Sequence, residues 1–302
     1  MRAFTLDSLE TPPGLREDLP APAPAEDEIL VRVHASSANP VDNAIAAGML
    51  AGMAEHTFPV VLGRDFAGVV EQAGAGAGGY AAGDEVFGFV PHADPDVHDG
   101  CWAEHITVAA AGIVATVPGG VDLASAGAAP LAGITALAAI DALELSEGDT
   151  LLVVGATGGV GSLAVQLAAA AGATVVATAL PEDDAFLRDL GVSEILPRDG
   201  DLSGVGADAL LDTVSYAAGA FDAALNDGAR IASPNGAAGD GPGRANVMAS
   251  AHPEHLPRVG ALLADGSLRI PIQATYELAQ AGDALGALTG SHTQGKRAIR
   301  IA

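Results

Sequence analysis

The sequence predicts an α/β protein of two domains, one a compact β-barrel-like domain and the other a doubly wound parallel sheet. The chain has 302 residues, which is long for a single core and suits two domains of ordinary size. Up to about residue 118, short β-rich runs alternate with Pro, Gly and Asp. Beyond that point, strand-like runs alternate with helical runs, a pattern typical of a parallel sheet with helices on both faces.

The first 118 residues are expected to supply the strands of the β-barrel-like domain. It contains five β-rich runs bounded by turn-forming residues. These predicted strands are 29–35, 66–72, 85–90, 102–108 and 113–117. The pattern changes at Pro118-Gly119-Gly120, which we interpret as a domain boundary.

The second half is expected to alternate between helices and strands. The predicted helices are 122–129, 133–143, 159–171, 182–190, 217–225, 254–264 and 277–288. The predicted strands are 151–154, 174–178, 194–196, 209–212, 230–232 and 296–301. The segment 234–247 is rich in Gly, Asn and Pro and is expected to form a surface loop.

The charge balance argues against polyanionic partners. Asp and Glu total 38 against 13 Lys and Arg, which gives a formal net charge of -25, and Lys296 is the single lysine. Nucleic acid and anionic membrane surfaces are therefore not expected as partners. The acidic surface favours solubility, and adaptation to a saline cytoplasm is an alternative explanation.

Cysteine usage and hydropathy predict a cytoplasmic protein. Cys101 is the only cysteine, so the sequence supplies neither an internal disulfide nor a thiolate cluster for zinc. The first residues lack the features of a secretion signal. The apolar stretches near 123–143 and 150–180 are interrupted before they reach the about 20 apolar residues that a membrane-spanning helix needs.

A glycine-rich turn is the strongest functional motif. The apolar run 151–154 has the composition of a buried strand and is followed by Gly155-Ala156-Thr157-Gly158-Gly159-Val160-Gly161 at the start of a predicted helix. The spacing of Gly155, Gly158 and Gly161 allows a sharp turn, close approach of the backbone to a pyrophosphate and close packing of helix on strand. The amides near Gly159 and Val160 would face the phosphates. A tight turn without a ligand is the alternative, and the second predicted strand at 174–178 favours dinucleotide binding.

The sequence resembles the medium-chain dehydrogenase/reductase superfamily, in its quinone oxidoreductase or zeta-crystallin-like branch. Besides the glycine turn, the motifs that carry the resemblance are Asn39-Pro40-Val41-Asp42, Gly63-Arg64-Asp65-Phe66-Ala67-Gly68, Gly83-Asp84-Glu85-Val86, Gly100-Cys101-Trp102-Ala103-Glu104-His105, Gly133-Ile134-Thr135-Ala136 and Gly295-Lys296. The resemblance implies a GroES-like catalytic domain formed by 1–118 and 266–302, and a Rossmann domain formed by 119–265. It also implies an active site between the two domains and a homodimer.

The same resemblance implies an enzyme without catalytic zinc. Zinc-dependent relatives carry a cysteine where Asn39 stands and a histidine where Arg64 stands, and catalytic zinc typically needs three protein ligands. A rival metal site is offered by an acidic loop, for which we prefer the interpretation of a solvated lid. Its candidate ligands are His92, Asp94, Asp96, His98 and Asp99.

The predicted reaction is hydride transfer from a nicotinamide cofactor to a quinone or an α,β-unsaturated carbonyl. By resemblance, Asn39 contacts the nicotinamide ribose or the substrate region, Asp42 orients that network, and Thr135 reaches the nicotinamide end. The alternatives are an ordinary helix start at 39–42 and an ordinary helix residue at Thr135. Arg64 is a third catalytic candidate, with a structural ion pair as the alternative. Cys101 is expected to be a buried, inert thiol rather than a nucleophile.

Two alternatives to this reaction stay open. Many relatives carry a tyrosine shortly after the Asn-Pro-x-Asp motif, whereas the segment 46–50 here has none, which leaves solvent to protonate the product. The absence of this tyrosine argues against an enoyl reductase that acts on a biosynthetic intermediate, but that class remains an alternative. The other alternative is a dinucleotide-binding protein with a sensing or structural role and no catalysis.

The cofactor is predicted to be NADPH, with NADH as the alternative. The expected end of the second strand, around Thr178, lacks the carboxylate with which NAD-specific sites hold the ribose. Arg198 is a candidate partner for a 2′-phosphate, with a solvated loop charge as its alternative role. The acidic run 182–184 would oppose a phosphate brought close.

Overall fold

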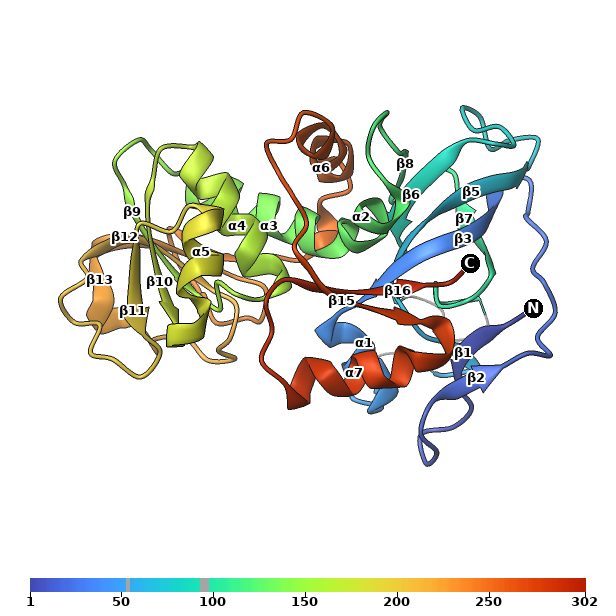
Figure 1. Cartoon of the computed structure of the whole chain (residues 1–302), viewed down its shortest axis with the longest axis horizontal. Helices are drawn as coiled ribbons and strands as arrows, with labels where there is room; N and C mark the ends of the chain where they lie inside the picture. Colours follow the sequence, from blue (N-terminus) through green and yellow to red (C-terminus); the bar gives the residue numbers. More distant parts are fainter. Residues whose placement is uncertain (53–54, 93–97) are drawn as a thin grey trace. The chain divides into compact units, whose positions relative to one another are not determined.

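The protein divides into two compact units. The structure, a computed structural model, describes residues 1–52, 55–92 and 98–302. Unit 1 comprises residues 1–131, 256–264 and 272–302, and unit 2 comprises 132–255 and 265–271 (Figure 1). Both ends of the chain therefore contribute to unit 1. These limits differ from the predicted domains, 1–118 with 266–302 and 119–265, because the segments 119–131 and 256–264 cluster with unit 1 and the segment 266–271 clusters with unit 2.

Unit 1 is built on a seven-stranded sheet and a small three-stranded sheet. The large sheet has the order β15-β16-β3-β5-β6-β8, with β7 also paired to β3, and the small one has the order β2-β1-β4. All pairs are antiparallel except β15 with β16. The strands are β1 (Ala3–Leu6), β2 (Gly14–Arg16), β3 (Glu28–Ala38), β4 (Val60–Val61), β5 (Asp65–Ala73), β6 (Glu85–Phe89), β7 (His105–Ala109), β8 (Val114–Thr116), β15 (Ile272–Glu277) and β16 (Lys296–Arg300).

The helices of unit 1 pack closely on this sheet. They are α1 (Pro40–Ala46), α2 (Leu123–Ala128), the 3₁₀ turn Leu278–Gln280, α7 (Ala281–Gly290) and all of α6 (His255–Ala264) except its first residue. A Cβ on Gly127 of α2 would lie 2.7 Å from the carbonyl oxygen of Ala35, and one on Gly260 of α6 would lie 3.1 Å from Phe87. These close approaches explain why α2 and α6 cluster with the β-rich unit.

Unit 2 is a six-stranded parallel sheet of order β11-β10-β9-β12-β13-β14. Numbered along the chain, this is the 3-2-1-4-5-6 order of a doubly wound dinucleotide-binding sheet, which confirms the predicted fold class. Helix α4 packs on β9 and β10 (Figure 1). The strands are β9 (Thr150–Val154), β10 (Thr174–Ala179), β11 (Glu194–Pro197), β12 (Ala207–Asp212), β13 (Leu225–Ser233) and β14 (Arg244–Asn246). The helices are α3 (Pro130–Leu143), α4 (Gly159–Ala170), α5 (Asp184–Leu190) and the 3₁₀ turns Pro181–Asp183, Asp222–Ala224 and Ala249–Ala251.

Two predictions for unit 2 are wrong. The predicted helix 217–225 is a series of turns that ends in the 3₁₀ turn at 222–224, because Gly219 has a φ of +89° and Leu225 already begins β13. The predicted surface loop 234–247 contains β14, whose Ala245 pairs with Ala232 of β13, and it buries Ala238. In both places sheet pairing overrides the local preference of Ala-rich or Gly-rich sequence.

The N-terminal end of β7 also differs from the expectation. The predicted strand 102–108 begins only at His105, because the backbone around Trp102 bonds elsewhere: its N–H donates to Leu62 and its carbonyl accepts from Phe4, both at 2.8 Å. The indole ring is fully buried in the core of unit 1. Trp102 therefore links the small sheet to the large one.

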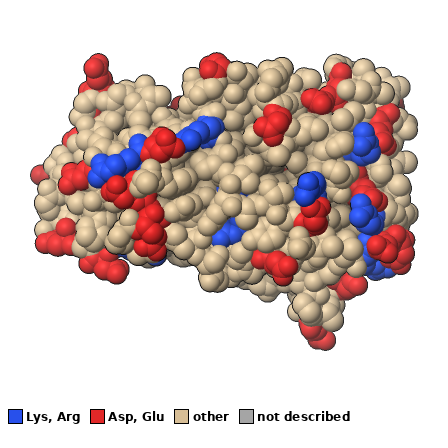
Figure 2. Space-filling view, viewed as in Figure 1, with Lys and Arg blue, Asp and Glu red and all other residues tan. Residues whose placement is uncertain are grey.

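The surface is acidic but carries many ion pairs. Figure 2 shows Asp and Glu spread over the visible face, with several Lys and Arg side chains directly beside them. Arg188 pairs with Asp184, for example, and Arg16 pairs with Asp18, each at 2.9 Å. Among the described residues, no helix is both long and apolar enough to cross a membrane.

Candidate functional site

The glycine turn of unit 2 has the geometry of a strand-to-helix junction that requires glycine twice. Gly155 follows β9 with a φ of +85°, and a Cβ there would lie 2.2 Å from the Oγ1 of Thr213. A Cβ on Gly161, in the first turn of α4, would lie 2.1 Å from the carbonyl oxygen of Gly155. Side chains are excluded at both positions by the protein itself, so these two glycines serve the tight turn and the packing of helix on strand.

Gly158 is different, because the protein leaves space beside it. It is the N-cap of α4, with φ -72° and ψ 175°, and the nearest atom to a Cβ built there is 3.4 Å away. Its backbone suits any residue, so neither strain nor packing inside the chain calls for glycine. A group from outside the chain that approaches the backbone would explain it, and the pyrophosphate of a dinucleotide is such a group.

The start of α4 can bind an anion. The amides of Gly159, Val160 and Gly161 lie in its first turn, where a helix has no internal acceptor for them, and Gly158 supplies no side-chain cap. The first turn also holds no acidic side chain, so the positive end of the helix dipole is uncompensated. This turn therefore fits a diphosphate without any basic side chain.

The acidic run after β10 is arranged differently from the expectation. The carboxylate of Asp183 is fully buried and accepts a hydrogen bond from the N–H of Leu180 at 3.1 Å. Asp184 forms its ion pair with Arg188. Two of the three carboxylates in 182–184 are thus already engaged within the chain, which reduces their repulsion of a phosphate.

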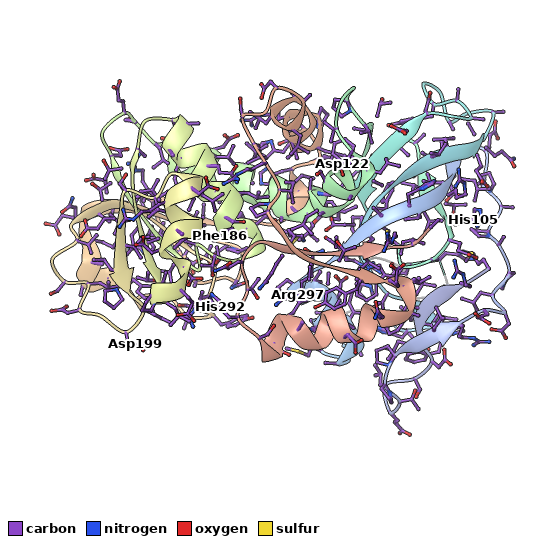
Figure 3. All side chains as sticks on the ribbon, in the orientation of Figure 1. His105, Asp122, Phe186, Asp199, His292 and Arg297 are labelled. Atoms are coloured by element: carbon purple, nitrogen blue, oxygen red, sulfur yellow. The ribbon has the colours of Figure 1, made fainter. Side chains whose placement is uncertain are left out.

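Arg198 lies next to the end of β10. Its N–H donates to the carbonyl oxygen of Ala179, the last residue of β10, at 3.0 Å, while its side chain is exposed. Within the described part of the chain, no hydrogen bond or ion pair engages its guanidinium. The turn that carries it follows β11, and its neighbour Asp199 is labelled in Figure 3. Arg198 is therefore available to an anion beside Thr178, the penultimate residue of β10, which is 7% exposed.

Thr135, the remaining cofactor candidate, lies on α3 and is buried. It belongs to unit 2, as do Thr178, Arg198 and the glycine turn. Its contact with a nicotinamide stays a prediction.

The catalytic candidates lie together in unit 1, in a buried cluster of polar side chains centred on Asp65. The carboxylate of Asp65 is fully buried and accepts hydrogen bonds from Ser37 Oγ at 2.6 Å, Asn39 Nδ2 at 2.8 Å and the N–H of Leu131 at 2.8 Å. The ammonium of Lys296 lies 3.5 Å from the same carboxylate and donates to Asn39 Oδ1. Asn39 is thereby fixed through both ends of its amide.

Asp42 and Arg64 extend this cluster. Asn39 is the N-cap of α1, and its N–H donates to Asp42 Oδ2 at 2.7 Å, so the Asn-Pro-x-Asp motif forms the helix start that was its alternative interpretation. The other oxygen of Asp42 lies 4.0 Å from Nε of Arg64, and neither atom has a hydrogen-bond partner. Both side chains are buried. An oxygen and an N–H that face each other without bonding are unusual inside a protein.

Burial shifts the titration of this cluster. Burial raises the pKa of Asp42 to about 7, although the charge of Arg64 opposes the shift. Burial also lowers the pKa of Lys296, against the attraction of Asp65 and Asp42. Asp42 can therefore gain or lose a proton near neutral pH.

Arg64 makes its main contacts with Asp99. Its guanidinium donates to the carboxylate of Asp99 at 3.2 Å and to the backbone oxygen of the same residue, and His92 Nδ1 contacts that carboxylate too. These contacts support the structural role that was the alternative for Arg64. Two of the candidate ligands in the acidic loop that is the rival metal site, Asp94 and Asp96, lie outside the described residues.

Comparisons with known proteins agree with this geometry. Residues 25–119 match the family model described as the alcohol dehydrogenase GroES-like domain, and residues 184–299 match that described as zinc-binding dehydrogenase. A solved quinone oxidoreductase from Coxiella burnetii superposes with a TM-score of 0.87 and 28% identity, over 100% of this chain and 99% of that one.

The chain belongs to the medium-chain dehydrogenase/reductase superfamily. Unit 1 has the superfamily's GroES-like fold and unit 2 its Rossmann fold, as the sequence predicts. Members of this superfamily are oxidoreductases that use nicotinamide dinucleotides.

Curated relatives point in two directions within this superfamily. The chain is 36% identical to a chloroplast envelope quinone oxidoreductase homolog of Arabidopsis thaliana, over 59% of this chain and 54% of that protein. It is 32% identical to a phthioceranic/hydroxyphthioceranic acid synthase of Mycobacterium tuberculosis, over 93% of this chain and 14% of that protein. The chain thus spans about half the length of the first relative and about one seventh of the second.

Several residues of the candidate site were missed from the sequence. Lys296 contacts Asn39, Asp99 contacts Arg64, and Ser37 contacts Asp65, but none of the three was proposed for the site. A sequence signal existed for Lys296, because it is the single lysine of the chain and lies in the Gly295-Lys296 motif. Cys101 agrees with the prediction of an inert thiol: it is fully buried, and burial raises its pKa.

Proposed function

We propose that the chain transfers hydride from a nicotinamide dinucleotide, NADPH in preference to NADH, to a quinone or an α,β-unsaturated carbonyl without a catalytic metal. The observation that carries the proposal is the buried cluster around Asp65. In this cluster, Asn39 and Arg64 occupy the two positions at which zinc-dependent relatives have ligands. Asn39 is bound to Lys296, and Arg64 is bound to Asp99.

The chemistry of these residues does not suit a catalytic zinc. An amide oxygen is a poor zinc ligand and a guanidinium is no ligand at all, since zinc prefers thiolate, imidazole and carboxylate. Lys296 and Arg64 also bring two positive charges to the carboxylates of the cluster, at 3.5 Å and 3.2 Å. A divalent cation would have to displace or neutralise both. We therefore derive no catalytic step through a metal.

Without a metal, the substrate must already be electrophilic. The nicotinamide, when bound, supplies the hydride. In this proposal Asn39 contacts the cofactor's ribose or the substrate, and Asp65 and Lys296 fix its amide. Asp42 fixes the backbone of Asn39, and Arg64 lies beside Asp42. Solvent protonates the product, because segment 46–50 has no tyrosine.

The preference for NADPH is supported by the end of β10. Arg198 offers an unpaired guanidinium there, and the nearby Asp183 and Asp184 are engaged with Leu180 and Arg188. An arginine that pairs with phosphate forms strong, charge-assisted hydrogen bonds. Of the three carboxylates in the run 182–184, only that of Glu182 would be available to hold the ribose of NADH.

A second substrate class, enoyl thioesters of a biosynthetic pathway, is favoured by one comparison. The match to the mycobacterial synthase extends over 93% of this chain, more than the 59% matched by the chloroplast protein. An enoyl thioester is also a conjugated carbonyl, so the chemistry of the two candidates is the same. They differ in the size and polarity of the acceptor.

The proposal includes a cytoplasmic homodimer. Its support is the superfamily resemblance together with Cys101, a free thiol that a reducing compartment preserves. Light scattering on a sizing column measures the mass in solution, and a mass of one chain would contradict the dimer.

The decisive experiment measures loss of the nicotinamide absorbance with NADPH or NADH and a panel of quinones, enones and enoyl thioesters. We expect turnover of a quinone or enone, undiminished after dialysis against a strong chelator. Activity that is lost on chelation while circular dichroism shows the fold intact, and that zinc restores, would contradict a metal-free catalytic site. Tight NADPH binding without turnover on any acceptor would support the non-catalytic alternative, and turnover confined to thioesters would support the biosynthetic one.

A further inference from the structure

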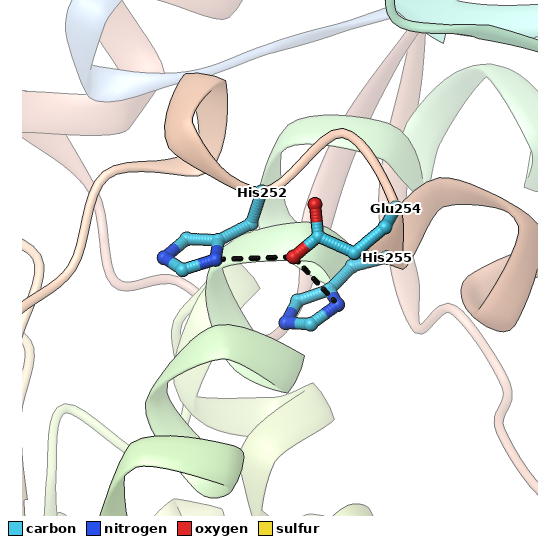
Figure 4. Close-up of side chains that lie close together, drawn as sticks. All are labelled: His252, Glu254 and His255. Atoms are coloured by element: carbon cyan, nitrogen blue, oxygen red, sulfur yellow. Dashed lines mark hydrogen bonds and ion pairs between the residues drawn. The ribbon is translucent and has the colours of Figure 1, made fainter.

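A group of two histidines and one glutamate lies in unit 2, in the segment that leads into α6. His252 follows the 3₁₀ turn Ala249–Ala251, and His255 is the first residue of α6. In Figure 4 a carboxylate oxygen of Glu254 faces a nitrogen of each imidazole. It lies 3.4 Å from His252 Nδ1 and 3.8 Å from His255 Nδ1.

The spacing of these atoms is close to that of a metal site. One ligand atom from each residue lies within 4.8 Å of the others. Two ligands bound to zinc at about 2.0–2.1 Å and a tetrahedral angle are roughly 3.3 Å apart. Small rotations of exposed Glu254 and half-buried His252 would close the remaining distance, because neither is locked in the core.

Asp141 of α3 orients the buried histidine. Its carboxylate lies 3.5 Å from His255 Nε2, on the side of the ring opposite Glu254. A carboxylate at that distance favours the proton on Nε2 and leaves the lone pair of Nδ1 for a metal. The two imidazole rings are stacked, at an angle of 11° with centroids 5.2 Å apart, so the half-buried ring of His252 must turn before both Nδ1 lone pairs can point at one ion.

We propose that His252, Glu254 and His255 bind one zinc ion through His252 Nδ1, a carboxylate oxygen of Glu254 and His255 Nδ1, with Asp141 holding His255 in place. Three protein ligands leave the fourth position to water. None of these residues belongs to the glycine turn or to the cluster around Asp65.

Zinc at this position would stabilise the segment 252–255 within unit 2. It would cross-link His252, Glu254 and His255 within this segment, and the contact of His255 with Asp141 would connect the segment to α3. A ligand that binds only the folded chain raises the unfolding temperature. The role proposed for this ion is structural, and it is independent of the hydride-transfer proposal.

The test uses the untagged full chain, freed of metal with a chelator and titrated with Zn²⁺ in a calorimeter. Co²⁺ in a parallel titration reports coordination number by the strength of its visible absorption. We expect one equivalent of Zn²⁺ bound and a raised unfolding temperature. His252→Ala and Glu254→Gln change partly or fully exposed side chains, and each should weaken binding at least tenfold. Asp141→Asn should weaken it about 10- to 100-fold.

Two variants serve as controls. His105 pairs with Glu71 at 3.2 Å but has no second histidine in that pair, so His105→Ala should leave zinc binding unchanged. His98→Ala tests the acidic loop that is the rival metal site. Absence of zinc binding to the full chain would overturn the proposal. So would binding that survives both His252→Ala and Glu254→Gln, or binding lost in His98→Ala.

Discussion

Lys296 donates a hydrogen bond to the side chain of Asn39, a residue 257 positions earlier in the chain. The register of β16 against β3 creates this contact, because Arg297 is the partner of Ala38. The same lysine lies beside Asp65. The contact therefore joins the end of the described chain to the motif that carries the main catalytic candidate.

Replacing Lys296 by methionine should strongly destabilise unit 1. The substitution keeps the length of the side chain but leaves Asp65 with one fewer counter-ion in a fully buried site. Removing one partner of a buried pair costs about 3–5 kcal/mol. Urea denaturation measures the loss. Arg300→Met, four residues on in the same strand, is the control, because the exposed pair of Arg300 with Glu277 should contribute far less.

Asp42 should make the protein less stable as pH rises from about 4 to about 7. Its pKa is about 7 in the folded chain against 3.8 for an unperturbed aspartate, so over this pH range the folded state retains a proton that the unfolded state has lost. Asp42→Asn removes this titration, so the stability of the natural chain relative to the variant should fall across that window. Denaturation at a series of pH values measures the difference.

Asp18 provides a control of opposite sign. A hydrogen bond from Arg16 lowers the pKa of Asp18, so its contribution is present above the unfolded pKa and is lost as pH falls. Asp18→Asn should therefore cost more at neutral pH than at low pH. A parallel trend for both variants would contradict the assignment of Asp42.

Gly158→Ala should weaken dinucleotide binding and leave the fold intact. The nearest atom to the added Cβ is 3.4 Å away, and the φ of -72° suits alanine, so we expect a stability loss below about 1 kcal/mol. The methyl group would stand between the backbone and the pyrophosphate. We expect a Kd for NADPH at least tenfold higher, by calorimetry.

Gly161→Ala separates packing from binding at the same turn. Its Cβ would meet the carbonyl oxygen of Gly155 at 2.1 Å, and overpacking of this kind costs about 1–3 kcal/mol. The unfolding temperature of this variant should drop clearly, in contrast with Gly158→Ala. Unchanged NADPH affinity in Gly158→Ala would contradict a pyrophosphate at this turn.

Arg198→Ala should weaken NADPH binding about 10- to 100-fold and leave NADH binding unchanged, because a hydrogen bond to a charged group contributes about 1.5–3 kcal/mol. Fluorescence titration with each cofactor measures both values. Arg188→Ala is the matched control, since Arg188 is also exposed but is paired with Asp184. Equal losses for the two cofactors would show that Arg198 does not bind the 2′-phosphate.

The sequence alone predicted those parts of the fold that are determined by a few consecutive residues. The strand at 150–154 is apolar and buried, and the turn that follows it contains Gly155 and Gly161. Both the turn and the parallel sheet could therefore be predicted. The helix predicted at 217–225 failed because its Ala-rich composition says nothing of the pairing of Leu225 with Ala207 across the sheet. The helix at 159–170 succeeded because its packing on the sheet agrees with its propensity.

The candidate site was predicted only in part, for a related reason. Asn39, Asp42 and Arg64 were found from motifs, but their partners Lys296 and Asp99 come from elsewhere in the chain. The direction of Asp183 toward the N–H of Leu180 is likewise set by the turn around it. Contacts that depend on strand register or on loop conformation leave no pattern in the residues themselves.

The division of unit 1 between both ends of the chain sets an order of events during synthesis. Residues 132–255 emerge from the ribosome before β15 and β16, so the parallel sheet can close while unit 1 still lacks its last two strands. Until Lys296 arrives, the carboxylate of Asp65 has no ammonium beside it. A nascent chain stalled before residue 296 would therefore expose an incomplete sheet edge, and chaperones and proteases would recognise it as unfinished.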